Sequence, residues 1–242
     1  MQELKTFLRG TLLDMAVPYF QTLNVEGRSL YGPSLSTVTP EGGVGDIVTG
    51  SRIPPRDIIV HFLIKAPNAQ EHLRSVRILN RYLGWRGESR FHFSDERGYR
   101  LGQTSSVSSP PFDRWQGEGT FTIHCSDPFL HMPMREISGN PVTFDVLDCM
   151  AIGLTKVSFT GSGGTVTLKN HRTFQRIELE GLPAGKEIII TEDAITCGGD
   201  PCTKNLNFET STWKDFEVWP EDTLEVTGAS TVPVYEYERL IL

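Results

Sequence analysis

The chain has 242 residues, of which 38% are hydrophobic and 22% are charged, and its formal net charge is −7 at pH 7. This composition is typical of a globular chain of one or two domains, since domains average about 100–150 residues. The longest apolar run, residues 58–64, is interrupted by His61 and is far shorter than the roughly 20 residues of a membrane helix. The acidic balance argues against nucleic-acid binding as the main role. No secretory signal is expected, because Asp14 interrupts the apolar stretch near the N-terminus.

The charge is distributed unevenly along the chain. Residues 1–133 contain 14 Lys and Arg against 13 Asp and Glu, whereas residues 134–242 contain 9 against 17, a net charge of −8. Twelve of the 14 basic residues in the first part are Arg, the side chain that suits partly buried, bidentate or stacked contacts. The change of composition near Pro133 predicts two domains, residues 1–133 and residues 134–242.

The first 50 residues are mixed in character and rich in turns. Residues 41–46, Glu-Gly-Gly-Val-Gly-Asp, predict a loop because closely spaced glycines resist regular structure. Residues 57–65 are mostly β-branched and aromatic and lie between Pro55 and Pro67, which predicts a strand that is buried on both faces or nearly so.

A helix of about four turns is expected next. Asn68 can act as its N-cap with Glu71 three residues later, and Gly84 is placed to end it. One face of the helix is apolar at helical spacing. The residues alone leave open whether a second, basic face is merely solvated or forms an interface. That face carries Arg74, Arg77 and Arg81.

Strand-like pieces follow the helix. Residues 89–93 alternate between polar and apolar, and residues 94–98 read as a hairpin turn before a return strand. The Ser- and Pro-rich residues 103–111 predict a long surface loop, and residues 119–125 predict another alternating strand. The first domain is therefore expected to be β-barrel-like, with one α-helix and a hairpin.

The second part has a purely β texture. Short apolar or alternating runs are separated by Gly, Pro, Asn or Asp, and this spacing of strands and turns is typical of a β-sandwich or barrel. The expected strands cover residues 142–146, 157–160, 164–168, 175–179, 186–191, 205–208 and 223–226.

Candidate chemistry is sparse. No nucleophile elbow, zinc-protease helix or phosphate-binding loop motif occurs, so no catalytic residue, cofactor or metal site is predicted. His124 and Cys125 fall on opposite faces of an expected strand and cannot share one ion. The paired acids Glu221-Asp222 lie in an expected turn, where solvation is the simplest explanation. Cys197 and Cys202 flank a turn, and their redox state is left open.

Aromatic residues offer one alternative role. Trp213 and Trp219 lie close together near the end of the chain. If they were exposed they could stack on sugars or contact proteins, and if they were buried they would belong to the core. An exposed pair would make the second domain a carbohydrate-binding module acting on host cell-surface glycans.

The first part contains a series of motifs in a characteristic order. They are residues 56–62 (RDIIVHF), the helix end Leu83-Gly84, residues 91–96 (FHFSDE), Tyr99 in the return strand and residues 117–129 (GEGTFTIHCSDPF). This order resembles the N-terminal domain of distal tail proteins of long non-contractile-tailed phages, the siphophages. The second part resembles, less specifically, the galectin-like β-sandwich that follows in that family, although Pro220-Glu221 stands where the family usually has a Pro-Gly turn.

The resemblance implies a structural protein of the virion tail tip, made in the host cytoplasm, with no catalytic residues. Family members form hexameric rings through their N-terminal domains and act as the baseplate hub between the tail tube protein and the tail-associated or fibre protein. In some phages the outer domain carries receptor-binding proteins or binds host sugars. The genome DNA passes through the ring without specific recognition, and no membrane contact is implied.

Overall fold

The computed structural model describes residues 3–108 and 115–242. It divides into two compact units, Met1–Leu130 together with Leu242, and His131–Ile241. The strand β10 (Leu130–His131) straddles this division, whereas the sequence predicts the boundary after Pro133. Each unit contains its own cluster of buried apolar side chains. The prediction of a mainly β chain is confirmed.

Unit 1 is built on one antiparallel sheet of seven strands, in the order β2-β1-β7-β8-β9-β6-β3. Burial alternates along β6, which lies between β9 and β3, so that Ile58, Val60, Phe62 and Ile64 are fully buried while the residues between them are half-buried. The bounds are β1 (Thr6–Leu8), β2 (Thr11–Leu12), β3 (Phe20–Glu26), β6 (Arg56–Lys65), β7 (Ser89–Phe93), β8 (Arg100–Ser108) and β9 (Gln116–Cys125).

The helix α2 (Ala69–Leu83) forms as predicted. The side chain of Asn68 accepts a hydrogen bond from the backbone N–H of Glu71 at 3.0 Å, which is the expected cap. His72, Ser75, Leu79 and Leu83 are its buried residues. A second, short helix, α1 (Leu13–Ala16), is an addition to the one helix that the sequence predicts.

The hairpin of β7 and β8 is confirmed, but the predicted loop at residues 103–111 is wrong for its first part. Residues 103–108 continue β8 and pair with β9, while residues 109–111 lie outside the described residues. Most of these Ser and Thr side chains are exposed. A polar strand of this kind has the composition of a loop, so periodicity could not identify it.

Asp14 in α1 joins two strands that do not pair with each other. Its Oδ2 accepts a hydrogen bond from the backbone N–H of Thr6 in β1 at 3.1 Å, and its Oδ1 accepts one from the N–H of Thr22 in β3 at 2.8 Å. The hydroxyls of Thr6 and Thr22, both buried, lie 2.9 Å apart. The carboxylate therefore connects β1 to β3 across the curled sheet, although these two strands do not pair through backbone hydrogen bonds.

Replacing Asp14 with Ala is expected to lower the free energy of unfolding of unit 1 by about 3 kcal/mol, because it leaves backbone and hydroxyl donors of Thr6 and Thr22 without an acceptor. Urea denaturation of the full chain measures this. Glu88→Ala, at an exposed position of the same unit, is the matched control and should change the midpoint little. Equal midpoints for both variants would show that the bridge does not stabilise the sheet.

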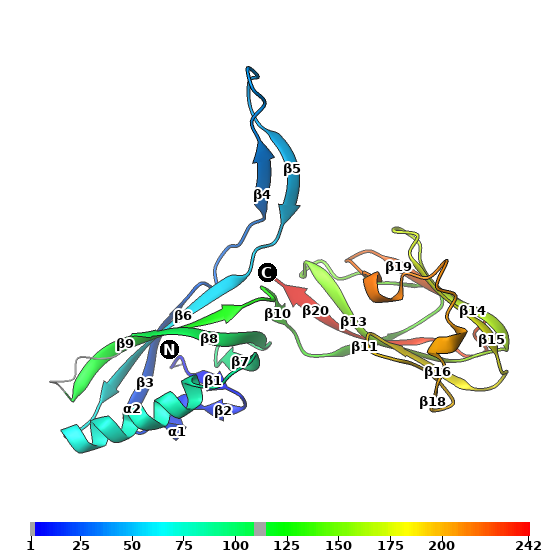
Figure 1. Ribbon diagram of the computed structural model, residues 1–242. Helices are drawn as coiled ribbons and strands as arrows, with labels where there is room; N and C mark the ends of the chain where they lie inside the picture. Colours follow the sequence, from blue (N-terminus) through cyan, green and yellow to red (C-terminus); the bar gives the residue numbers. More distant parts are fainter. Residues whose placement is uncertain (1–2, 109–114) are drawn as a thin grey trace. The chain divides into compact units, whose positions relative to one another are not determined.

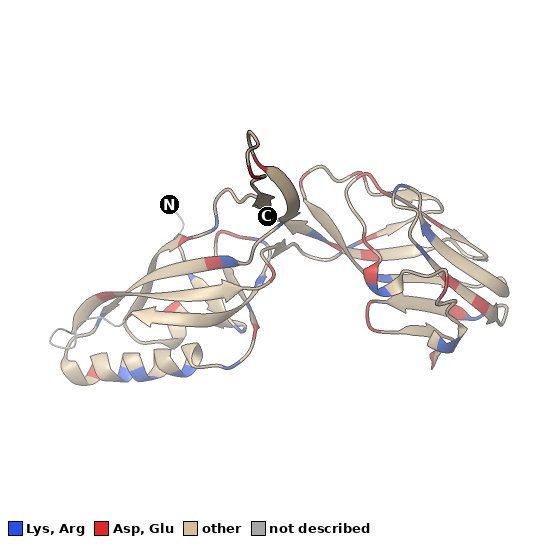
Figure 2. Cartoon of the chain, turned by 45° about the horizontal axis from the view of Figure 1, so that its top comes forward, with Lys and Arg blue, Asp and Glu red and all other residues tan. Residues whose placement is uncertain are grey.

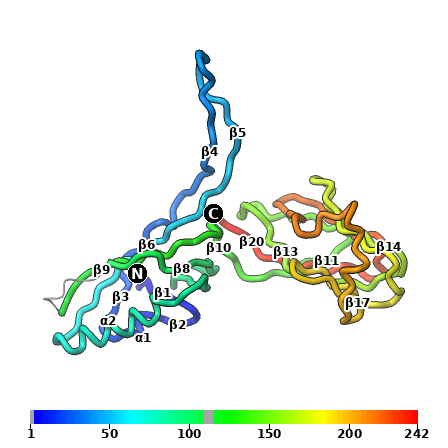
Figure 3. Tube along the Cα trace, in the orientation of Figure 1, coloured from blue at the N-terminus to red at the C-terminus, as the bar shows by residue number. Residues whose placement is uncertain are grey.

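A separate two-stranded ribbon, β4 (Ser34–Val38) and β5 (Ile47–Arg52), extends away from this sheet (Figures 1 and 3). We call residues 34–52 the arm. The predicted loop at residues 41–46 is confirmed as its tip, whereas the sequence does not predict the two strands. The pairing register shifts between Ser36 and Thr37, so the ribbon contains a bulge or similar irregularity.

Unit 2 is a sandwich of two antiparallel sheets, which confirms the prediction of a β-sandwich or barrel. One sheet has the order β10-β20-β13-β16-β17-β18, with β11 also paired to β20, and the other has the order β12-β19-β14-β15. The strands are β11 (Arg135–Ser138), β12 (Val142–Thr143), β13 (Ala151–Thr160), β14 (Gly164–Asn170), β15 (Arg176–Leu182), β16 (Glu187–Thr191), β17 (Ile195–Cys197), β18 (Asp200–Pro201), β19 (Thr223–Thr227) and β20 (Val234–Ile241).

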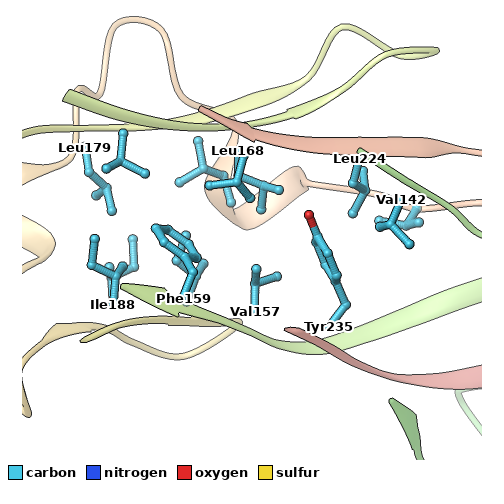
Figure 4. Close-up of a cluster of buried hydrophobic side chains, with 14 of the residues drawn as sticks. Val142, Val157, Phe159, Leu168, Leu179, Ile188, Leu224 and Tyr235 are labelled. Atoms are coloured by element: carbon cyan, nitrogen blue, oxygen red, sulfur yellow. The ribbon is translucent and has the colours of Figure 1, made fainter. Parts of the chain in front are cut away.

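The core of unit 2 lies between these sheets. Figure 4 shows Leu168, Leu179 and Leu224 from one sheet pointing toward Phe159 and Ile188 from the other. The predicted strand at residues 205–208 is wrong. The 3₁₀-helix η1 (Thr203–Asn205) runs into it, and of these residues only Leu206 forms an isolated bridge, to Leu179. A second 3₁₀-helix, η2, covers Trp213–Asp215.

Candidate assembly interface

The arm exposes a group of apolar side chains to solvent. Every residue of β4 and β5 is exposed. An isolated two-stranded ribbon is marginally stable in water, and exposed apolar clusters mark interaction sites. We therefore expect another protein surface to cover the ribbon. Its exposed apolar side chains are Leu35 (57%), Val38 (55%), Val44 (106%), Ile47 (58%) and Val48 (56%).

The charged side chains of the arm are all negative, except for Arg52 at its end. No Lys or Arg occurs between Arg28 and Arg52, whereas Glu41 and Asp46 both lie in the tip. The hydroxyl of Thr39 donates to Oδ1 of Asp46 at 2.7 Å, which fixes this carboxylate at the junction of tip and strand. The tip is therefore an acidic end on an apolar ribbon.

The root of the arm is held by a buried arginine. The guanidinium carbon of Arg56 lies 4.2 Å from the ring centroid of Tyr31, and the Tyr31 hydroxyl donates to the carbonyl of Pro54 at 3.0 Å. Arg56 is 1% exposed, and burial, with the nearby Arg100, lowers its pKa. Tyr31 thus ties the segment that enters the arm to the segment that leaves it.

A glycine makes this root possible. Gly27 follows β3 with φ +86°, and a Cβ added there would lie 2.1 Å from the carbonyl oxygen of Asp57. No other residue fits that approach of the two chain segments. The direction in which the arm departs is therefore set by backbone packing as well as by Tyr31 and Arg56.

The arginines predicted on α2 do share one exposed face. Arg74, Arg77 and Arg81 are all exposed, on the side opposite to the buried residues of the helix. Nη1 of Arg74 lies 3.5 Å from Glu71, while Arg77 and Arg81 form no ion pair with any described residue. Figure 2 shows these basic positions along α2. The structure thus brings the three residues together, and their role in an interface remains a prediction.

The two tryptophans proposed as a sugar platform are engaged within unit 2. Trp213 is half-buried and packs against the core, and its Nε1 donates to the carbonyl of Thr191 at 2.9 Å. Nζ of Lys214 lies 4.4 Å from the centroid of the Trp213 ring. The indole of Trp219 donates to Glu217 at 3.3 Å. Trp213 is therefore held by packing within unit 2, and the role of the two tryptophans as a sugar platform stays a prediction.

Comparison with known proteins identifies the fold. No protein-family model matches the sequence, and no curated protein matches it significantly. Among solved structures, the Dit protein of phage SPP1 matches over 100% of both chains, with a TM-score of 0.83 and 16% identity. The chain has the fold of a distal tail protein. The resemblance found in the sequence is therefore confirmed at the level of the fold.

Two structures of the phage P2 baseplate in its activated conformation, with Ca and with Sr, match more distantly. The TM-scores are 0.53 and 0.51 at 7% identity, and the matches cover 99% and 98% of this chain and 98% and 97% of the baseplate chains. The SPP1 protein is described as a paradigm of the hub adsorption apparatus in phages that infect Gram-positive bacteria. All three matches span both units of the distal tail protein fold.

The cysteines and histidines that could have supported other chemistry have structural roles or contacts in the fold. The four cysteines are free, and burial raises the pKa of Cys125 to about 12. His124 is bonded to Asp57 at 2.8 Å while Cys125 is buried, which confirms that they point to opposite faces. The described residues contain no group of three or more His, Cys, Asp or Glu arranged to hold a metal. No described helix has the length and hydropathy of a membrane span.

Asp222 was expected to be a solvated turn residue, and this is wrong. It is fully buried, accepts a hydrogen bond from Nδ2 of Asn170 at 2.7 Å and another from the backbone N–H of Trp219 at 2.9 Å, and is also bonded to Nε of Arg172. Burial alone would raise the pKa of Asp222, but the bonds from Arg172, Asn170 and Trp219 outweigh it and hold the pKa below its usual value.

Because the folded pKa of Asp222 is depressed, its contribution to stability is present above the unfolded pKa of about 3.9 and is lost as the pH falls through the folded value. Asp222→Asn is expected to lower the free energy of unfolding of unit 2 by roughly 2 kcal/mol at pH 7 and to flatten its decline below pH 4. Urea titrations at several pH values measure both effects. The exposed Asp193→Asn should follow the wild type, and an unchanged pH slope in Asp222→Asn would contradict the assignment.

Proposed function

We propose that the protein is a structural hub component of a phage tail tip or baseplate and has no catalytic role. The supporting observation is the likeness to the SPP1 hub protein over both full chains, at a TM-score of 0.83. In this role copies of the chain form a ring, hexameric as in the family it resembles. The ring joins the tail tube protein to the tail-associated or fibre protein, resides in the virion and can carry receptor-binding components.

The arm supports assembly independently of the fold comparison. Its apolar side chains are more than half exposed, so their burial is available only to an intermolecular contact. In a closed ring each copy gives its arm to one neighbour and receives the arm of another, so that every arm is covered. Unit 1, which carries the arm and is close to neutral in charge, is the ring-forming part in this proposal.

Unit 2 fits a projecting role. Residues 134–242 carry a net charge of −8, which favours solubility and disfavours close packing of one copy against another. The alternative of a carbohydrate-binding module has less support, because Trp213 packs against the core of the unit and the ammonium group of Lys214 lies over its ring.

Purified protein is expected to form rings visible by negative-stain electron microscopy, with a mass in light scattering that is a multiple of the 27.1 kDa chain. The variant Leu35→Ser/Val38→Ser/Ile47→Ser should lose the rings and remain folded, because these side chains are more than half exposed and lie outside the buried core of unit 1. The control Phe174→Ser removes an exposed aromatic side chain from unit 2 and should assemble normally. A wild type that stays monomeric at high concentration would contradict the proposed function.

A further inference from the structure

We infer that the tip of the arm of one copy docks on the exposed face of α2 of the neighbouring copy, where Glu41 and Asp46 face Arg74, Arg77 and Arg81. The inference rests on the proposed ring and adds the identity of the surface that receives the arm. The occupant of the α2 face is thus a second copy of this chain.

The tip of the arm carries an apolar side chain between two acidic ones. Val44 is fully exposed and stands between Glu41 and Asp46 in the sequence of the tip. Neither carboxylate forms an ion pair with a described residue, whereas Asp95, Glu26 and Asp57 elsewhere in unit 1 each have a basic partner. The tip therefore carries two charges that no described side chain neutralises.

The α2 face provides the complementary surface. Its three arginines have only Glu71 as a nearby acid, so it carries two uncompensated positive charges against the two negative charges of the tip. Arg74 and Arg81 are seven residues apart, which corresponds to about 10 Å along a helix. The aliphatic stems of the arginines offer apolar surface to Val44 while the guanidinium groups reach the carboxylates.

The pairing has to occur between copies. In unit 1 the arm extends from one side of the sheet, and α2 covers the other side (Figures 1 and 3). The arm therefore cannot fold back onto the α2 of its own chain. Charge pairs of this kind contribute orientation and selectivity, while the apolar ribbon contributes most of the buried area.

The test is a charge exchange in the full-length protein. Arg77→Glu/Arg81→Glu is expected to raise the concentration at which half of the protein is assembled by about tenfold or more, because acidic groups would then face acidic groups. Glu41→Arg/Asp46→Arg should have the same effect. The chain that combines all four substitutions should assemble within about threefold of the wild type, because the charges are again complementary. Arg97→Glu, in the turn between β7 and β8, is the control and should leave assembly unchanged.

If the wild type forms rings, both charge-reversal variants lose them and the combined variant does not regain them, the docking site is overturned. The proposed ring itself would then stand. A monomeric wild type would overturn both. A second measurement covers the case in which a reversal variant misfolds. Glu41→Cys on a tagged copy and Arg77→Cys on an untagged copy should form a mixed disulfide in the ring under mild oxidation, whereas Glu41→Cys with Arg97→Cys should not. Absence of the first cross-link in assembled rings would also overturn the docking site.

Discussion

The curvature of the sheet of unit 1 depends on the carboxylate of Asp14, which connects β1 and β3 where no backbone pairing joins them. β1 and β3 lie close enough for the hydroxyls of Thr6 and Thr22 to touch, but the backbone N–H groups of these two residues donate to Asp14. A buried donor without an acceptor costs more than an ordinary hydrogen bond gains. The position of Asp14 in a four-residue helix thus determines how far the sheet curls.

The other functional elements of unit 1 are positioned from this curled sheet. The chain leaves α1 through Pro18, whose carbonyl accepts a hydrogen bond from the hydroxyl of Ser75 at 2.7 Å, so α2 is anchored to the same turn. β3 then leads through Gly27 to the root of the arm, and β6 receives the chain at Arg56. The arm and the arginine face of α2 are therefore fixed to one scaffold, although they serve different neighbours in the proposed ring.

Local signals in the sequence were sufficient for some elements. Asn68 and Glu71 define the start of α2, and the spacing of the arginines places them on one face before any tertiary contact is known. The alternation along β9 likewise separates His124 from Cys125. The arm was not predictable in this way, because its strands are exposed on both faces and lack the periodicity that burial creates. Asp222 was misjudged for the opposite reason. Its partner Asn170 is 52 residues away, and only the folded sandwich brings the two together.

The irregular pairing at Ser36 and Thr37 has a consequence for how the subunit survives before it assembles. A flat ribbon with free edges invites further strands and leads to open-ended aggregation. This ribbon is interrupted in register and carries Ser and Thr side chains among its apolar ones, so it offers a poor template for adding identical strands. Single copies are consequently less prone to open-ended association through this ribbon before they enter the proposed ring.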